Sequence, residues 1–191
     1  MRISKLSIAM GILFIGAIWG LLEATMGNIL HWIGLHPYTG VIMTSFGIGF
    51  LTFGRRLYPR RWTSIAIAAI AASLKALDFL VPGSNVLRPI IAILSIGLAY
   101  EGAMAITEHL KQTQVLKAAT GLIVGYASIT AFTYITAYIV RYYYWLNKGF
   151  VGILKYLGTQ GWMFGAGGAL MGLVGHNLEG LLERTTNLTR F

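Results

Sequence analysis

Cysteine is absent from this chain of 191 residues, and charged residues are scarce. The lack of cysteine excludes a disulfide framework, thiol catalysis and any metal site built from cysteine ligands. Charged residues make up 11% of the sequence, whereas hydrophobic residues make up 56%. This balance indicates a protein that crosses a lipid bilayer several times.

The hydrophobic residues fall into six segments, most of them close to the length of about 20 residues that a helix needs to cross a bilayer. Their approximate bounds are 6–30, 38–54, 62–82, 87–106, 118–140 and 159–179. Pro37, the basic stretch 55–61, the turn 82–85 and the polar connector 108–117 separate the first five. The sequence therefore predicts an all-α fold: a polytopic membrane bundle of six transmembrane helices, forming one integral-membrane domain over residues 1–191.

The first segment runs on to residue 30 without a small-residue cleavage site, so we expect a retained span and not a signal peptide. The stretch 141–158 differs from the six spans. It opens with Tyr142, Tyr143, Tyr144 and Trp145, an aromatic cluster suited to the bilayer interface, and continues as an amphipathic piece. We expect an interfacial helix or a lid there, with a plain aromatic belt as the alternative.

Basic residues are distributed unequally between the two sides of the predicted bundle. Ten lie on one side: Arg2, Lys5, Arg55, Arg56, Arg60, Arg61, Lys111, Lys117, Arg184 and Arg190. Four lie on the other: Arg88, Arg141, Lys148 and Lys155. Because Lys and Arg favour the cytoplasmic side, both termini are predicted to be cytoplasmic, in the plasma membrane. The clustering beside hydrophobic spans argues against nucleic acid as a partner, despite the net charge of +9.

Four ionisable residues lie inside or at the ends of hydrophobic segments: Glu23, Lys75, Asp78 and Arg88. Such groups cost several kcal/mol in a bilayer unless they have a partner or a function. Counted at about 1.5 Å per helical residue, all four lie toward the extracellular side, as does His31. Two interpretations remain open. Lys75 and Asp78, three residues apart, can form a local pair, which leaves Glu23 to pair with Arg88 or His31. Alternatively, all of these groups can line one substrate-binding cavity.

The first segment places Gly16, Gly20, Glu23, Gly27 and His31 on one helical stripe, at steps of three or four residues. Small residues spaced in this way let another helix approach closely. The cytoplasmic half of the stripe, Gly16 and Gly20, is therefore predicted to dock a partner helix. Its extracellular half carries the polar groups.

The fifth segment carries a stripe of hydroxyl groups that includes Tyr126, Thr130, Tyr134 and Tyr138. These groups can bond to carbonyls of their own helix, or they can line a pocket for a polar, partly aromatic molecule. The sixth segment is rich in glycine, which favours tight packing or sliding. Glu101 and His176, near the cytoplasmic side, are expected either to pair or to contact a partner.

Several chemistries lack the residues that they need. The four histidines provide no two axial ligands at a common depth for a transmembrane haem. The sequence contains no HExxH, GxSxG, P-loop or GxGxxG motif, and no metal or cofactor is expected. An intramembrane enzyme or redox subunit that uses Glu23 and Asp78, and a small scaffold whose charges only pair, remain the alternatives to a binding protein.

Taken together, these features resemble the substrate-binding (S) components of energy-coupling-factor transporters. The resemblance rests on six spans, cytoplasmic termini, polar groups gathered near the extracellular side and a small-residue face on the first helix. In that family, alanines spaced by four on the first helix dock onto a coupling membrane subunit; Gly16 and Gly20 are the nearest match here. The histidine-containing start of the cobalt and nickel members is missing, since this chain begins Met1-Arg2-Ile3.

The resemblance implies a subunit that captures a small organic micronutrient, a vitamin or a precursor. It also implies separate coupling and ATP-hydrolysing partners within the lipid membrane, since the chain has no nucleotide motif of its own. The binding residues that it implies are those already named: Glu23, His31, Lys75, Asp78, Arg88, Tyr126, Thr130, Tyr134 and Tyr138.

Overall fold

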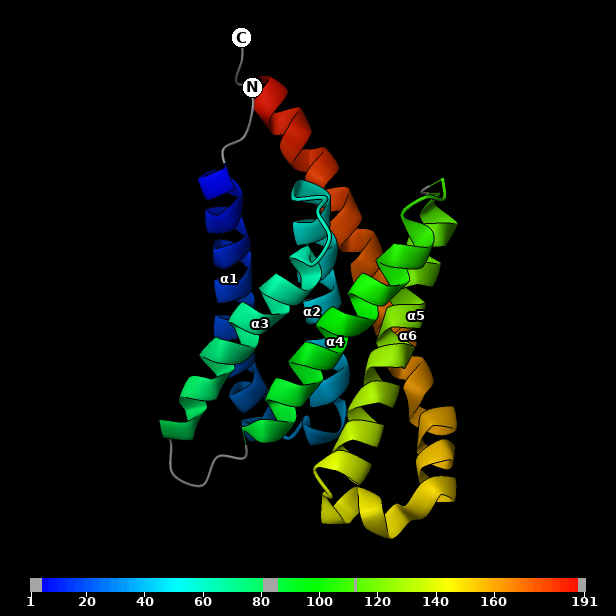
Figure 1. The fold of residues 1–191 in the computed structure, drawn as a ribbon. Coiled ribbons are helices and arrows are strands. Elements are labelled where there is room, and N and C mark those ends of the chain that lie inside the picture. Colours follow the sequence, from blue (N-terminus) through cyan, green and yellow to red (C-terminus); the bar gives the residue numbers. More distant parts are fainter. Residues whose placement is uncertain (1–4, 81–85, 112, 189–191) are drawn as a thin grey trace.

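The computed structural model describes residues 5–80, 86–111 and 113–188, and all regular secondary structure in these ranges is helical (Figure 1). The six long helices are α1 (Lys5–Trp32), α2 (His36–Leu57), α3 (Thr63–Ala76), α4 (Leu87–Thr107), α5 (Gln114–Tyr134) and α6 (Tyr143–Leu188). A 3-10 turn, η1 (Leu77–Leu80), extends α3, and a π-helical turn, η2 (Ile135–Ile139), extends α5. The prediction of an all-α fold is confirmed.

Within the described ranges, four helical stretches are long and apolar enough to cross a membrane: Leu6–Leu30, Thr63–Leu80, Leu87–Thr107 and Gln114–Ile139. Their most apolar windows are only 28–39% buried inside the protein. Large apolar side chains accordingly face outward, among them Met10, Leu98 and Leu170, each more than half exposed. An apolar surface of this extent is unusual for a soluble monomer and is typical of a protein embedded in lipid.

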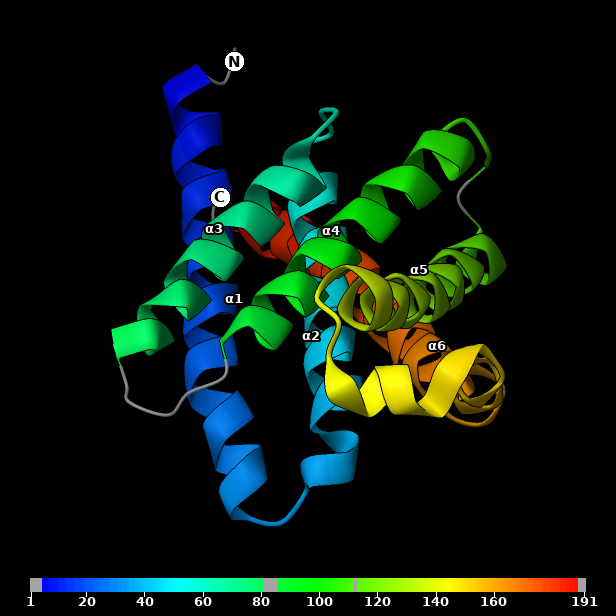
Figure 2. The ribbon, with the colours of Figure 1, turned by 60° about the horizontal axis from the view of Figure 1, so that its bottom comes forward.

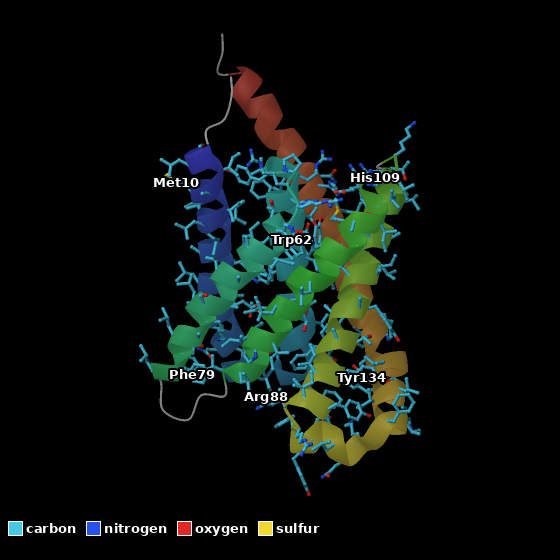
Figure 3. All side chains as sticks on the ribbon, viewed as in Figure 1. Met10, Trp62, Phe79, Arg88, His109 and Tyr134 are labelled. Atoms are coloured by element: carbon cyan, nitrogen blue, oxygen red, sulfur yellow. The ribbon has the colours of Figure 1, made fainter. Side chains whose placement is uncertain are left out.

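Successive long helices run in alternating directions, so α1 begins and α6 ends at the upper end of the bundle in Figure 1. Around the bundle, α1 packs on α3, α3 on α4, α4 on α5, α5 on α6, and α6 on α2, which returns to α1. We call the end at which α1, α3 and α5 terminate the lower end. In Figure 3, Arg88, Phe79 and Tyr134 lie there, whereas Met10 and His109 lie at the upper end.

Several predicted boundaries shift by a few residues. Pro37 was expected to end the first helix, but α1 ends at Trp32 and Gly34 turns the chain with a φ of 80°. Pro37 instead lies in the first turn of α2, where its missing N–H costs no helical hydrogen bond. The turn predicted at 82–85 falls outside the described residues.

Glycines at their contact let helices α5 and α6 pack with their backbones almost touching. A Cβ atom built on Gly168 would lie 2.2 Å from the carbonyl oxygen of Gly121, and one on Gly125 would lie 2.1 Å from that of Phe164. Only glycine allows so close an approach. The prediction that glycines of the sixth segment serve tight packing is confirmed at this contact.

The start of α6 crosses the lower end of the bundle before the helix turns upward (Figure 2). The corner is Gly149, whose φ of 60° and ψ of 178° are not helical. Residues before it, 143–148, run across the end of α5, whereas Phe150 begins the part of α6 that continues to Leu188. The prediction of one interfacial segment over 141–158 is therefore wrong beyond Gly149, because the amphipathic piece belongs to the long helix.

At the upper end, an ion-pair network joins α2 to α4. The guanidinium of Arg55, a buried side chain, lies 3.1 Å from Glu101 Oε1 and 3.0 Å from Glu108 Oε2. The Glu101 carboxylate also accepts hydrogen bonds from the backbone N–H groups of Trp62 and Ser64 at the start of α3. Glu101 thus pairs with arginine and caps a helix, and the predicted pairing of Glu101 with His176 is wrong.

Candidate functional site

A cavity of about 690 Å³ opens at the lower end of the bundle, between α1, α2, α3, α4, α5 and α6. Glu23, Lys75, Asp78 and Arg88 all line it. These four residues come from three parts of the sequence: α1, the end of α3 with η1, and the start of α4. The structure thus unites the ionisable residues that the depth count places together. Volumes of about 300–1,000 Å³ are usual for small-molecule sites.

Lys75 and Asp78 form an ion pair on the cavity wall. The ammonium of Lys75 lies 2.6 Å from Asp78 Oδ2, and it also donates to the main-chain oxygen of Glu23 at 3.1 Å. Lys75 is buried, whereas the Asp78 side chain is 22% exposed. The local pair that the spacing of three residues predicts is confirmed. Because both members also line the cavity, the pair and the cavity are compatible interpretations.

Glu23 is buried, 6% exposed, and its Oε1 accepts a hydrogen bond of 3.2 Å from Trp19 Nε1 on the preceding turn of α1. Sequence reasoning did not single out Trp19, although a spacing of four residues on one helix is a usable signal. It named Arg88 and His31 as partners of Glu23. Arg88 instead contacts Tyr142, so that pairing is wrong, and the side chain of His31 lies outside the described residues.

Arg88 is the second residue of α4 and therefore lies at the positive end of the helix dipole. Its Nη1 donates to the hydroxyl of Tyr142 at 2.8 Å, and its Cζ lies 4.3 Å from the centroid of the same ring. Both contacts hold the guanidinium against an aromatic group rather than an acid. The positive charge of Arg88 therefore faces the cavity without a carboxylate among the residues that the structure describes.

Aromatic side chains, mostly from α6, cover another part of the cavity. This aromatic wall consists of Phe132, Tyr142, Tyr144, Trp145, Tyr156 and Phe164. The Trp145 ring meets those of Tyr144 and Tyr156 edge to face, with centroids 4.9 and 4.8 Å apart. Lys148 places its ammonium 4.8 Å from the Tyr144 centroid.

The residues of the predicted aromatic cluster divide between the cavity and the protein surface. Tyr142, Tyr144 and Trp145 line the cavity, whereas Tyr143 is 75% exposed. Tyr142 precedes the short helix that crosses the lower end; within that helix, Tyr144 and Trp145 border the cavity and Tyr143 lies at the surface. The sequence alone left open whether this cluster covers a site or only marks the bilayer interface.

The predicted hydroxyl stripe of α5 does not line the cavity, and this part of the site prediction is wrong. Tyr126 donates to the main-chain oxygen of Leu157, and Thr130 donates to the carbonyl of its own helix at Tyr126. Tyr134 and Tyr138 stack on each other at 5.8 Å, and Tyr138 is about half exposed. The stripe faces α6 and the surface because the adjoining face of α5 turns inward.

That inward face contributes Ser128, Ile129 and Phe132, which sequence reasoning missed. Ser128 is buried and donates to the carbonyl of Gly125, as a hydroxyl inside a helix usually does. From α2, Thr44 and Met43 also line the cavity. None of these residues carries a charge. Unlike an ionisable residue in a hydrophobic segment, they therefore do not stand out in the sequence as candidates for a site.

The predicted docking stripe of α1 is occupied within the chain. A Cβ atom on Gly16 would lie 2.8 Å from Ile70 Cβ, and one on Gly20 would lie 2.9 Å from Leu74 Cβ, both on α3. The small residues therefore serve contact between α1 and α3, and the assignment of Gly16 and Gly20 to a separate partner is wrong. Gly27, farther along the stripe, borders the cavity instead.

A second, smaller pocket of about 370 Å³ lies at the upper end, bordered by Arg55, Arg56, Tyr100, Glu108 and His176. Within the described ranges, no three His, Asp or Glu side chains lie close enough together to hold a metal ion. His109 is exposed beside Glu108, with 3.8 Å between its Nε2 and Glu108 Oε1.

Comparison with known proteins gives no match: none among protein-family models, curated proteins or solved structures resembles this chain significantly.

Proposed function

We propose that this protein is a membrane-embedded subunit that captures a small polar organic solute, a vitamin or a precursor, for uptake. The observation that carries the proposal is the lower-end cavity, where four ionisable groups and a set of aromatic rings border one open space. Its volume of about 690 Å³ suits a small organic molecule and exceeds what a bare metal ion needs.

In this proposal all six long helices cross the plasma membrane, and both termini are cytoplasmic. The ten basic residues that the sequence analysis assigns to one side of the bundle then belong to the cytoplasmic side, in agreement with the distribution of positive charge in membrane proteins. The cavity accordingly opens to the extracellular side, where a solute arrives. Uptake would be driven by separate coupling and ATPase subunits, and the coupling subunit would contact a surface other than the Gly16–Gly20 face.

An open cavity favours capture over a purely structural role for these charges. A scaffold protein needs only sealed pairs, and the pair of Lys75 with Asp78 would satisfy that need without any space beside it. The cavity instead leaves Glu23 and Arg88 beside open volume. Buried charges are costly to maintain, so their place beside open volume is best explained by a ligand.

Mass spectrometry of small molecules that copurify with the full chain in detergent tests the proposal. We expect wild-type protein to carry a solute that Glu23→Ala and Asp78→Ala lose. Thr130→Ala is the matched control, because Thr130 lies on α5 outside the cavity and bonds only to its own helix. Size-exclusion profiles establish that each variant is folded. Recovery of the same solute from all four proteins, or no solute from wild type, would contradict the proposal.

A further inference from the structure

Among the described residues, two ionisable groups of the cavity wall form no ion pair. Lys75 and Asp78 offset each other, whereas the Glu23 carboxyl accepts a hydrogen bond from the neutral Trp19 and Arg88 donates to the neutral Tyr142. In the part of the chain that the structure describes, neither Glu23 nor Arg88 forms an ion pair. The wall therefore presents one acid and one base to the cavity.

The acid and the base lie on different helices. Glu23 belongs to α1, beside the end of α3, whereas Arg88 lies at the start of α4 against Tyr142. The guanidinium and the positive end of the α4 dipole both favour an anionic group of the ligand at this place. At Glu23, a carboxyl with a single neutral donor favours a cationic or N–H donor group.

The aromatic wall adds a requirement on shape. Trp145 and Phe164 are each 6% exposed and are held in place by packing, and Tyr144 and Tyr156 flank the Trp145 ring. Rigid aromatic surfaces of this kind bind a flat ring by stacking or by edge-to-face contact. A purely aliphatic solute would leave this contact unused.

From these three observations we infer that the solute is amphoteric and carries a flat ring. Its acidic group, a carboxylate or a phosphate, binds Arg88; its protonated amine or other N–H cation binds Glu23; its ring lies against the aromatic wall. This inference rests on the proposed function and specifies the chemistry of the molecule that the same cavity captures. Opposite charges on one ligand would match both unpaired groups of the wall at once.

The first part of the test examines the solute recovered from wild-type protein. We expect it to migrate as a cation at acidic pH and as an anion at alkaline pH, to absorb in the near ultraviolet as a conjugated ring does, and to reveal by its phosphorus content whether the acid is a phosphate. A solute that Glu23→Ala loses, but that carries charge of one sign or lacks a ring, overturns this inference and leaves the proposed function standing.

The second part measures affinities by calorimetry for the isolated solute and for its methyl ester, fully methylated if the acid is a phosphate, so that no acidic oxygen remains. Wild type should prefer the free acid by about 10- to 100-fold, the usual effect of a hydrogen bond between charged groups. Arg88→Gln should abolish this preference. Lys155→Gln, the control, should retain it, because it removes a positive charge from an exposed position of α6 that does not line the cavity. Retention of the preference in Arg88→Gln overturns the inference.

The two proposals fail in distinguishable ways. No copurifying solute from wild type, or equal recovery from the cavity variants, removes the proposed function and this inference together. A cavity-dependent solute of the wrong charge or shape removes only the inference.

Discussion

The ion pair of Lys75 with Asp78 allows a quantitative test of the packing at the lower end. Asp78→Asn keeps the shape of the side chain and removes its charge. The ammonium of Lys75, 6% exposed, would then retain the main-chain oxygen of Glu23 at 3.1 Å as its neutral partner. Removing one member of a fully buried pair typically costs about 3–5 kcal/mol.

Partial exposure reduces the effect expected here. Because the Asp78 side chain is 22% exposed, water screens the pair, and we expect a loss of about 2 kcal/mol in the free energy of unfolding. That loss corresponds to a decrease of about 4–8 °C in the midpoint of thermal unfolding. Adding Lys75→Met to Asp78→Asn removes the uncompensated charge, so the double variant should recover most of the stability.

The assay is thermal unfolding of the wild type, both single variants and the double variant in the same detergent, followed by tryptophan fluorescence. The double-mutant cycle isolates the coupling between the two side chains from the effects of each substitution alone. Equal midpoints for Asp78→Asn and wild type would refute the argument. A double variant as unstable as Asp78→Asn would also refute it, because the loss would then not arise from the charge of Lys75.

Three further substitutions, one of them with a control variant, test other contacts by the same measurement. Gly168→Ala should cost about 1–3 kcal/mol, because its Cβ would meet the backbone of α5 at 2.2 Å, whereas Gly158→Ala, with open space around it, should be neutral or slightly stabilising. Trp19→Phe removes the 3.2 Å donor to Glu23 and should cost about 1–3 kcal/mol; an unchanged midpoint would mean that this bond contributes nothing. Arg55→Met leaves two carboxylates without their cation and should cost about 2–4 kcal/mol, and a gain in stability would contradict the network at the upper end.

The ionisable residues were the most predictable part of the site. A charge in a hydrophobic segment is visible in the sequence because it breaks a pattern, and its depth follows from a rise of about 1.5 Å per residue. On that basis Glu23, Lys75, Asp78 and Arg88 were placed at one level, and they line one cavity. The spacing of Lys75 and Asp78 also predicted their pairing, since neighbours on a helix face are set by its period.

The face that each helix turns inward was much less predictable. The hydroxyl stripe of Tyr126 and Thr130 and the inward face of Ser128 lie on the same helix, and both are mixtures of small, polar and apolar residues. In a membrane protein the lipid side is as apolar as the core, so hydrophobicity does not separate the two faces as it does in water. The sequence of α5 therefore did not predict the rotation of the helix about its axis, which decides which side chains face the cavity.

The sequence by itself determined the helical class, the apolar segments and the depth of each charge, because all three follow from composition, run length and the geometry of a single helix. Only the tertiary structure decided which partner each group meets. Gly16 and Gly20 lie against α3, Glu101 meets Arg55, and Arg88 meets Tyr142. These contacts join residues far apart in the chain, and they depend on the order and rotation of six packed helices, to which no local pattern in the sequence corresponds.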